Sequence, residues 1–225
     1  MRNQTADQLR EELVQVAHKL FQAGVMFKGE HANLSARLGE DQMVITRGGS
    51  IAKLEKEDFA IVNLDGTVVE GHVEPVLAEV IEMHAAVYRE RPSVGGVIHN
   101  HAPHVTTFAI AHQPIPVVYE PLLRFGITEP IPVVPWAPRG SAESVGGIIE
   151  IVKSHPHLPA LMLANHGLLA YGKTPLDTAQ IVTTLDEAAE LILNARLIGG
   201  EKPLPDAAFA QVVERMRQFA EKVMA

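Results

Sequence analysis

Residues 94–104 read VGGVIHNHAPH, a short apolar strand that runs into three histidines. His99 and His101 are separated by one residue, so in an extended chain both imidazoles leave the same face of the strand. Two imidazoles held side by side suit one metal ion, whereas in an apolar core each would need its own hydrogen-bond partner. The stretch therefore predicts a strand over residues 96–101 that presents a pair of metal ligands. For His104, which follows Pro103 at a helix start, we favour a surface or supporting role.

The composition is that of an ordinary globular protein and predicts one domain over residues 1–225. The chain is 47% hydrophobic and 20% charged. Its net charge is −8 and no basic block occurs, which argues against nucleic-acid and anionic-membrane partners. It has no cysteine, so a transition metal would be held by histidine and carboxylate. No apolar run approaches the roughly 20 residues that cross a bilayer, and the N-terminal residues lead into a charged amphipathic helix, so we expect a cytoplasmic protein.

Helical and strand patterns alternate along the chain. Helices are expected over residues 5–24, between Pro75 and Pro92, after Pro103, from Ser141 to about Pro156, from Thr174 to Gly199, and at the C-terminus. Strands are expected over residues 34–37, 43–46, 60–64, 67–70, 96–101, 161–164 and 168–171, with a Pro-rich extended stretch that contains 117–119 and 131–134. Hairpin signals such as Asp65-Gly66 recur among the strands. We therefore predict a three-layer α/β/α fold around a central mixed, largely antiparallel sheet.

A further histidine, His166, lies in the tight turn formed by residues 164–167 between two apolar strands. Three histidines on one zinc ion leave a coordination position open, which is the arrangement of a catalytic site. The spacing leaves open whether His166 meets the other two, because a lone histidine at a strand end is more often a structural or surface residue. The residues alone thus favour a metal site without deciding its third ligand.

Several further motifs occur in a fixed order along the chain. They are residues 29–37 (GEHANLSAR), 44–49 (VITRGG), 65–66 (DG), the helix from Glu79 to His84 with Tyr88, 99–101 (HNH) and 165–168 (NHGL). Together they resemble the class II aldolase/adducin family, from about residue 8 to the C-terminus. The resemblance implies a nine-stranded sheet between helices and a homotetramer of four-fold symmetry, with active sites at subunit interfaces. It also implies a small-molecule substrate, such as a sugar phosphate.

The resemblance also assigns roles to individual residues. The metal ligands match His99, His101 and His166, with Zn2+ as first choice and Mn2+, Co2+ or Mg2+ as alternatives. The family's phosphate-binding loops match Asn33 and residues 46–49, which gives Asn33, Arg47, Gly48, Gly49 and Ser50 as substrate-binding candidates. The catalytic acidic residue matches Glu79, with Glu82 as second choice, because one residue is inserted before His84. Asn33 could instead simply cap a turn, and His84 and Tyr88 are expected to pack rather than to catalyse.

The match departs from the family where a phosphate is held. The family's loop hydroxyl is replaced by Gly48, although Ser50 lies nearby and Arg47 offers a guanidinium. A serine pair before the acidic residue is absent, which leaves room for a carboxylate substrate. A C-terminal tyrosine that assists proton transfer in the family aldolases corresponds to Phe219, and Tyr119 is one position away from another family tyrosine.

The activity implied by the resemblance is that of a metal-dependent lyase. It would cleave a small hydroxylated sugar phosphate or keto acid by a reversible aldol reaction, through a metal-stabilised enediolate. A carboxylate whose pKa is raised by burial would move the proton at carbon. A decarboxylase or epimerase with the same metal site is the alternative. A non-catalytic scaffold like the adducin head is less favoured, because all three histidines are present.

Overall fold

The computed structural model describes residues 4–26, 32–48, 50–75 and 78–224. Its strands form one eight-stranded sheet in the order β4-β3-β2-β1-β5-β8-β7-β6, in which β6 pairs with β7 in parallel and all other neighbours are antiparallel. The strands are β1 (Ala32–Leu38), β2 (Gln42–Thr46), β3 (Phe59–Asn63), β4 (Val68–Glu70), β5 (Gly96–Asn100), β6 (Val133–Val134), β7 (Ala160–Leu163) and β8 (Gly167–Gly172). The predicted mixed, largely antiparallel sheet is confirmed, and β5 lies at its centre.

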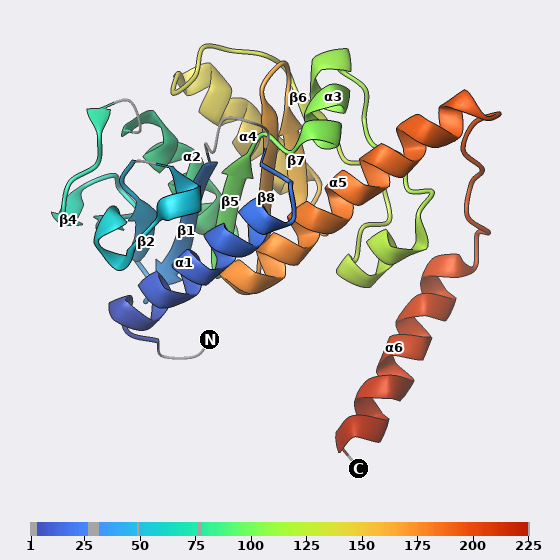
Figure 1. Ribbon diagram of the computed structural model, residues 1–225, viewed down its shortest axis with the longest axis horizontal. Coiled ribbons are helices and arrows are strands. Elements are labelled where there is room, and N and C mark those ends of the chain that lie inside the picture. Colours follow the sequence, from blue (N-terminus) through green and yellow to red (C-terminus); the bar gives the residue numbers. More distant parts are fainter. Residues whose placement is uncertain (1–3, 27–31, 49, 76–77, 225) are drawn as a thin grey trace.

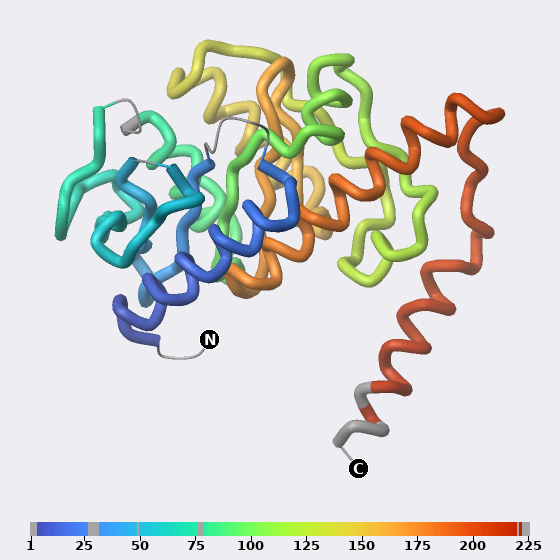
Figure 2. Tube along the Cα trace, viewed as in Figure 1, coloured from blue at the N-terminus to red at the C-terminus, as the bar shows by residue number. Residues whose placement is uncertain are grey.

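Helices cover both faces of the sheet, as the three-layer prediction requires (Figure 1). One face carries α1 (Ala6–Gln22), α3 (Pro103–Ala111) and α5 (Pro175–Leu197), and the other carries α2 (Ala78–Glu90) and α4 (Ala142–Ser154). Short 3₁₀ helices are η1 (Ile51–Lys53), η2 (Lys56–Asp58) and η4 (Glu120–Phe125). The last helix, α6 (Ala208–Met224), contacts η4 and points away from the sheet, as the trace in Figure 2 shows. No described helix has the length and apolar character to cross a membrane.

Two separate apolar cores explain the layers. Alternate side chains of the central strands point to opposite faces. On β5, Ile98 packs with the cluster under α1, α3 and α5, whereas Val97 packs with the cluster under α2 and α4. Each fully buried aliphatic side chain contributes roughly 1.5–3 kcal/mol. Because both faces of β5 are covered, polar side chains appear only where the strand ends, and this places His99 at the edge of the second core.

Local signals explain where the elements begin. The predicted capping box is confirmed, since Thr5 Oγ1 accepts from the backbone N–H of Gln8 and the Thr5 N–H donates to Gln8 Oε1. The 65–66 hairpin is also present, but β4 begins at Val68 rather than residue 67. The reason is that Asp65 Oδ1 accepts from the Thr67 N–H at 2.8 Å, which prolongs the turn.

The Pro-rich stretch forms less strand than its sequence predicts. Of residues 131–134 only Val133 and Val134 form a strand, and Ile115 makes an isolated bridge with Ile131. Prolines flank both bridge residues and lack the N–H that a longer ladder needs. Within the described residues the sheet therefore has eight strands, one fewer than the nine that the resemblance implies. The assignment of residues 1–225 to one domain stays a prediction.

Candidate metal centre and active site

The centre of the site is His99, near the end of β5. Its side chain is only 4% exposed, and Nδ1 lies 2.9 Å from the carbonyl oxygen of Leu168 on the neighbouring strand. A ring nitrogen beside a carbonyl must carry the proton, so Nδ1 donates and Nε2 keeps its lone pair. Burial, and then the nearby rings of His166 and His101, hold the pKa of His99 well below its ordinary value. The ring is therefore neutral and ready to bind a cation at physiological pH.

His166 reaches this strand end through a sharply shaped turn. Asn165 has a φ of 56°, in the left-handed region that asparagine tolerates, and its side chain makes a 2.6 Å hydrogen bond with His112. At Gly167 an added Cβ would lie 2.5 Å from the carbonyl oxygen of Asn100 and 2.8 Å from the ring of His101. Only glycine lets the turn approach β5 this closely. The turn thus brings His166 against the two histidines of the opening motif.

The three imidazoles meet in one cluster. The ring centroids lie 5.3 Å apart for His99 and His101, 4.7 Å for His99 and His166, and 4.9 Å for His101 and His166. Their ligand atoms all lie within 4.8 Å of one another. Burial, followed by the fields of His101 and Arg139, lowers the pKa of His166 to about 4, so its lone pair is also available. Three imidazole nitrogens gathered in this way, with a cavity beside His166, fit a divalent ion of the zinc type.

The two candidate carboxylates lie in different surroundings. Glu79, in the first turn of α2, lines a cavity together with His166 and forms an ion pair with Arg139. Glu82 forms an ion pair with Arg89 and does not line that cavity in the described part of the chain. The helix geometry contributes to this difference in surroundings, because side chains three positions apart on a helix point in directions about 60° apart. Of the two carboxylates, Glu79 is therefore the one that lines the same cavity as His166.

Asn33 is the substrate-binding candidate that the fold brings to the histidines. It lies opposite His99 in the antiparallel pair of β1 and β5, and it is 7% exposed. Directly paired residues project to the same face of a sheet. The Asn33 amide therefore lies beside His99, on the face covered by α2.

Two of the other substrate-binding candidates, Arg47 and Gly48, lie against charged side chains of neighbouring segments. Arg47 lies 3.4 Å from Asp58 Oδ1 and 3.4 Å from His72 Nδ1. A Cβ at Gly48 would lie 2.4 Å from the carboxyl group of Glu74, so this carboxylate packs directly on the loop. Ser50 precedes η1, and Gly49 lies outside the described residues. A role for Arg47, Gly48, Gly49 and Ser50 in substrate binding stays a prediction.

A buried hydrogen-bonded network lies between β1 and α2. Ser35 Oγ lies 2.7 Å from His84 Nδ1 and 2.9 Å from the hydroxyl of Tyr88. Burial lowers the pKa of His84 to about 3 and raises that of Tyr88. The pair at spacing i and i+4 thus packs in the core, as the sequence led us to expect, whereas Ser35 had given no signal of its own.

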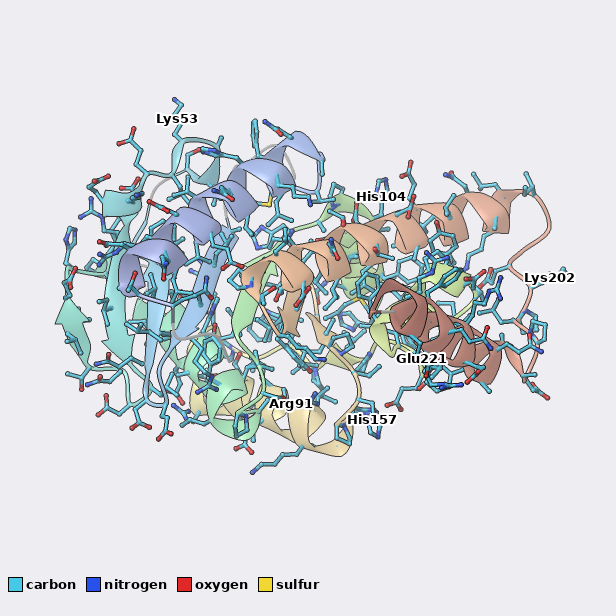
Figure 3. The ribbon with its side chains drawn as sticks, turned by 90° about the horizontal axis from the view of Figure 1, so that it is seen from below. Lys53, Arg91, His104, His157, Lys202 and Glu221 are labelled. Atoms are coloured by element: carbon cyan, nitrogen blue, oxygen red, sulfur yellow. The ribbon has the colours of Figure 1, made fainter. Side chains whose placement is uncertain are left out.

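Two further side chains shape the site that sequence patterns did not single out. Arg139 lies in the loop between β6 and α4 and lines the cavity beside His166. Asp186 of α5 is 4% exposed, and its Oδ1 accepts from the backbone N–H groups of His104 and Val105 at 2.8 and 3.1 Å. Asp186 thus caps the N-terminus of α3 although it belongs to α5, and it holds the backbone of the residues that follow His101. His104, labelled in Figure 3, also contacts Asp186 with its ring, in the supporting role expected for it. Neither residue belongs to a motif, so only the tertiary fold reveals them.

Tyr119 and Phe219 are the two positions of this chain that were compared with tyrosines of the family. The hydroxyl of Tyr119 donates to Glu187 Oε2 at 3.1 Å. Phe219 is 55% exposed on α6, with the guanidinium of Arg215 over its ring. In the described part of one chain, neither residue lines the cavity that contains His166.

Comparison with known proteins gives concordant results. Residues 11–193 match the model of the Class II Aldolase and Adducin N-terminal domain. The chain is 27% identical to a 5-methylthioribulose-1-phosphate/5-deoxyribulose-1-phosphate aldolase of Rhodospirillum rubrum, over 95% of this chain and 93% of that protein. It is 30% identical to an L-ribulose-5-phosphate 4-epimerase of Salmonella paratyphi A, over 77% and 80%. An L-fuculose 1-phosphate aldolase structure superposes with a TM-score of 0.83 at 25% identity, over 96% of this chain and all of that one.

Proposed function

The chain belongs to the class II aldolase and adducin family, and from this premise we propose that it is a metal-dependent carbon–carbon lyase. It would cleave a small hydroxylated sugar phosphate or keto acid by a reversible aldol reaction. The observation that carries the proposal is the convergence of His99, His101 and His166, with all their ligand atoms within 4.8 Å. This donor set suits a divalent ion, with Zn2+ as first choice and Mn2+, Co2+ or Mg2+ as alternatives.

The proposed chemistry divides the work between ion and protein. A divalent ion held by the three imidazoles would supply Lewis-acid stabilisation of the negative charge that develops on substrate oxygens during carbon–carbon cleavage. Neutral imidazoles leave such an ion its full positive charge. Asn33, beside His99, would hold the substrate through its amide. No lysine Schiff base is needed in this scheme.

Glu79 would move the proton. Its side chain is 27% exposed at the cavity that contains His166, so a carboxylate oxygen can take a proton from substrate carbon or oxygen and return it. Without substrate, this carboxylate forms an ion pair with Arg139. A carboxylate in this position is what proton transfer during aldol cleavage requires.

A decarboxylase or epimerase is the second candidate function. One of the relatives is an epimerase. Phe219 lies at the position compared with the family's proton-transferring tyrosine. It has no hydroxyl group, which favours a reaction in which another group transfers the proton. The three reactions differ in what is released: aldol cleavage releases an aldehyde, decarboxylation releases carbon dioxide, and epimerisation releases nothing.

A homotetramer with interface active sites, located in the cytoplasm, belongs to the same proposal. The support is the apolar face of α6, where Phe209, Val213, Met216 and Phe219 are 41–55% exposed. Exposed large side chains gathered on one face are typical of a subunit contact. Native mass determination tests the assembly, and a monomer at micromolar concentration would contradict it.

The function is tested with a substrate panel. Zinc-loaded protein is given ketose phosphates, hydroxylated 2-oxo acids and hydroxyaryl carboxylates, and aldehyde and carbon dioxide are measured separately. We expect aldehyde release that stops when a chelator removes the ion and returns when zinc is restored. Carbon dioxide without aldehyde would replace the lyase by the decarboxylase, and purified protein unable to bind any divalent ion would exclude both.

A further inference from the structure

The cavity beside His166 contains one strongly basic side chain. Among the described residues that line it, Arg139 is the only lysine or arginine, and Glu79 is the only carboxylate. Apolar walls are supplied by Met83, Trp136 and Ile148. The side chain of Arg139 is 54% exposed, so the guanidinium can change partner without unfolding its surroundings. Within the described lining, one exposed guanidinium is thus available in the cavity that contains His166.

Arg139 and the histidine cluster are connected by this cavity, because Arg139 and His166 both line it. An anionic group that binds Arg139 from inside the cavity would therefore lie in the same cavity as an ion held by His166.

The loop expected to hold an anion is poorly suited to a phosphate. The carboxyl group of Glu74 packs on Gly48, and the Glu74 N–H donates to the carbonyl oxygen of Arg47 at 3.0 Å. The Arg47 guanidinium is directed to Asp58. A phosphate dianion on this loop would meet the like charge of Glu74. Arg139 also has a carboxylate partner, Glu79, but it lines the cavity that contains His166 and so offers the substrate's anionic group a cation there.

We propose that Arg139 binds a carboxylate of the substrate, so that the substrate is a small hydroxylated oxo acid. This inference rests on the proposed function and names its substrate class. A guanidinium offers two parallel N–H donors that match the two oxygens of a carboxylate. A phosphate dianion would bring two negative charges to a cavity whose described lining offers one guanidinium, already paired with Glu79, whereas a carboxylate brings only one.

The proposed contact also changes the partner of Glu79. Without substrate, Arg139 pairs with Glu79. When the substrate carboxylate binds the guanidinium, Glu79 is released from this ion pair and can turn toward the substrate. Substrate binding and the release of Glu79 are thereby coupled through Arg139.

Binding is measured by calorimetry on zinc-loaded protein with three small probes. Hydroxypyruvate carries the ketone, the hydroxyl and a carboxylate, hydroxyacetone lacks the carboxylate, and dihydroxyacetone phosphate replaces it by phosphate. For Arg139→Met we expect the affinity for hydroxypyruvate to fall about 10- to 100-fold, as loss of a charge-assisted pair predicts, with hydroxyacetone within threefold of wild type. Arg139→Lys keeps the positive charge but lacks the two parallel N–H donors of a guanidinium, so it should recover part of the affinity.

Two control variants distinguish a direct contact between Arg139 and the carboxylate from indirect effects of charge. Arg124→Met removes an arginine from a surface ion pair with Glu120 and should bind all probes like wild type. In Arg139→Met, the unpaired Glu79 could repel hydroxypyruvate without any direct contact to Arg139. The double variant Glu79→Gln with Arg139→Met separates these cases, because it stays weak if Arg139 binds the carboxylate and recovers wild-type affinity if Glu79 only repels it.

The possible outcomes decide the inference. It is overturned if Arg139→Met binds hydroxypyruvate like wild type, if the double variant recovers, or if Arg47→Met rather than Arg139→Met loses the carboxylate preference. It is also overturned if Arg139→Met weakens dihydroxyacetone phosphate more than hydroxypyruvate. Wild-type protein that holds one zinc per chain but binds no hydroxypyruvate overturns this inference alone, whereas protein that holds no zinc contradicts the proposed function as well.

Discussion

Asn33 lies directly opposite His99 in the antiparallel pair of β1 and β5, so an amide and a buried imidazole share one face at the end of the central strand. The register between the strands fixes this relationship, and a slip of one residue would turn Asn33 to the other face. The proposed contact of Asn33 with substrate therefore depends on the register of the sheet rather than on a loop.

Replacing Asn33 should weaken substrate use and spare the metal. Asn33→Ala removes one hydrogen-bonding group, so we expect kcat/KM to fall about 10- to 100-fold, while zinc per chain stays at the wild-type value. Asn63→Ala, on β3, is the matched control. Steady-state kinetics and metal analysis of the same preparations provide the check. Loss of zinc in Asn33→Ala would make Asn33 a structural part of the metal centre instead.

The two carboxylates of α2 should differ sharply in kinetics. Glu79→Gln keeps the shape but cannot carry a proton, so we expect kcat to fall about 10²- to 10⁴-fold. Glu82→Gln breaks only the ion pair with Arg89 and should change kcat less than threefold. Turnover of both variants is compared at equal zinc content. If Glu82→Gln alone abolished turnover, the assignment of Glu79 would be wrong.

Asp186 should stabilise both α3 and the adjoining ligand His101. Asp186→Ala leaves the N–H groups of His104 and Val105 without their buried acceptor. We expect a loss of about 2–4 kcal/mol in the free energy of unfolding and a weaker affinity for zinc. Chemical denaturation and zinc titration measure the two effects. Glu190→Ala, an exposed change on the same helix, serves as control, and equal stability of both variants would refute the capping role.

The stability of metal-free protein should fall in acid because of its buried histidines. His84 has a folded pKa of about 3, below the ordinary value near 6.5, so between these values the unfolded chain binds the extra proton. Stability is then fully present above about pH 6.5 and is lost as the pH falls toward 3. His84→Gln should reduce this slope by about 1.4 kcal/mol per pH unit between pH 6 and 4.

Urea denaturation from pH 7.5 to 4, with chelator present, measures the slope. The exposed His157→Gln is the control and should keep the wild-type slope. An unchanged slope in His84→Gln would mean that His84 is protonated in the folded protein.

Local patterns were sufficient for most of the elements and for two of the three histidines of the candidate metal centre. The two-residue period of a strand put His99 and His101 on one face, and this needs no knowledge of the rest of the fold. The capping box at Thr5 and the turn at Asp65-Gly66 are similarly local, and both occur as expected.

The sequence could not show which of these distant residues meet in the folded chain. That His166 meets His99 depends on the pairing of β5 with β8 and on the close approach that Gly167 permits. The choice between Glu79 and Glu82 depends on partners from other elements, Arg139 and Arg89. Arg139 itself lies in an irregular loop, where no periodicity indicates which direction a side chain takes.

The central claim is that three imidazoles bind one cation, and X-ray absorption spectroscopy of zinc-loaded protein tests it most directly. We predict one zinc per chain with three imidazole nitrogens at about 2.0–2.1 Å, and one imidazole fewer in His166→Ala. A wild-type spectrum with two or fewer imidazoles, or an identical spectrum for His166→Ala, would contradict the account.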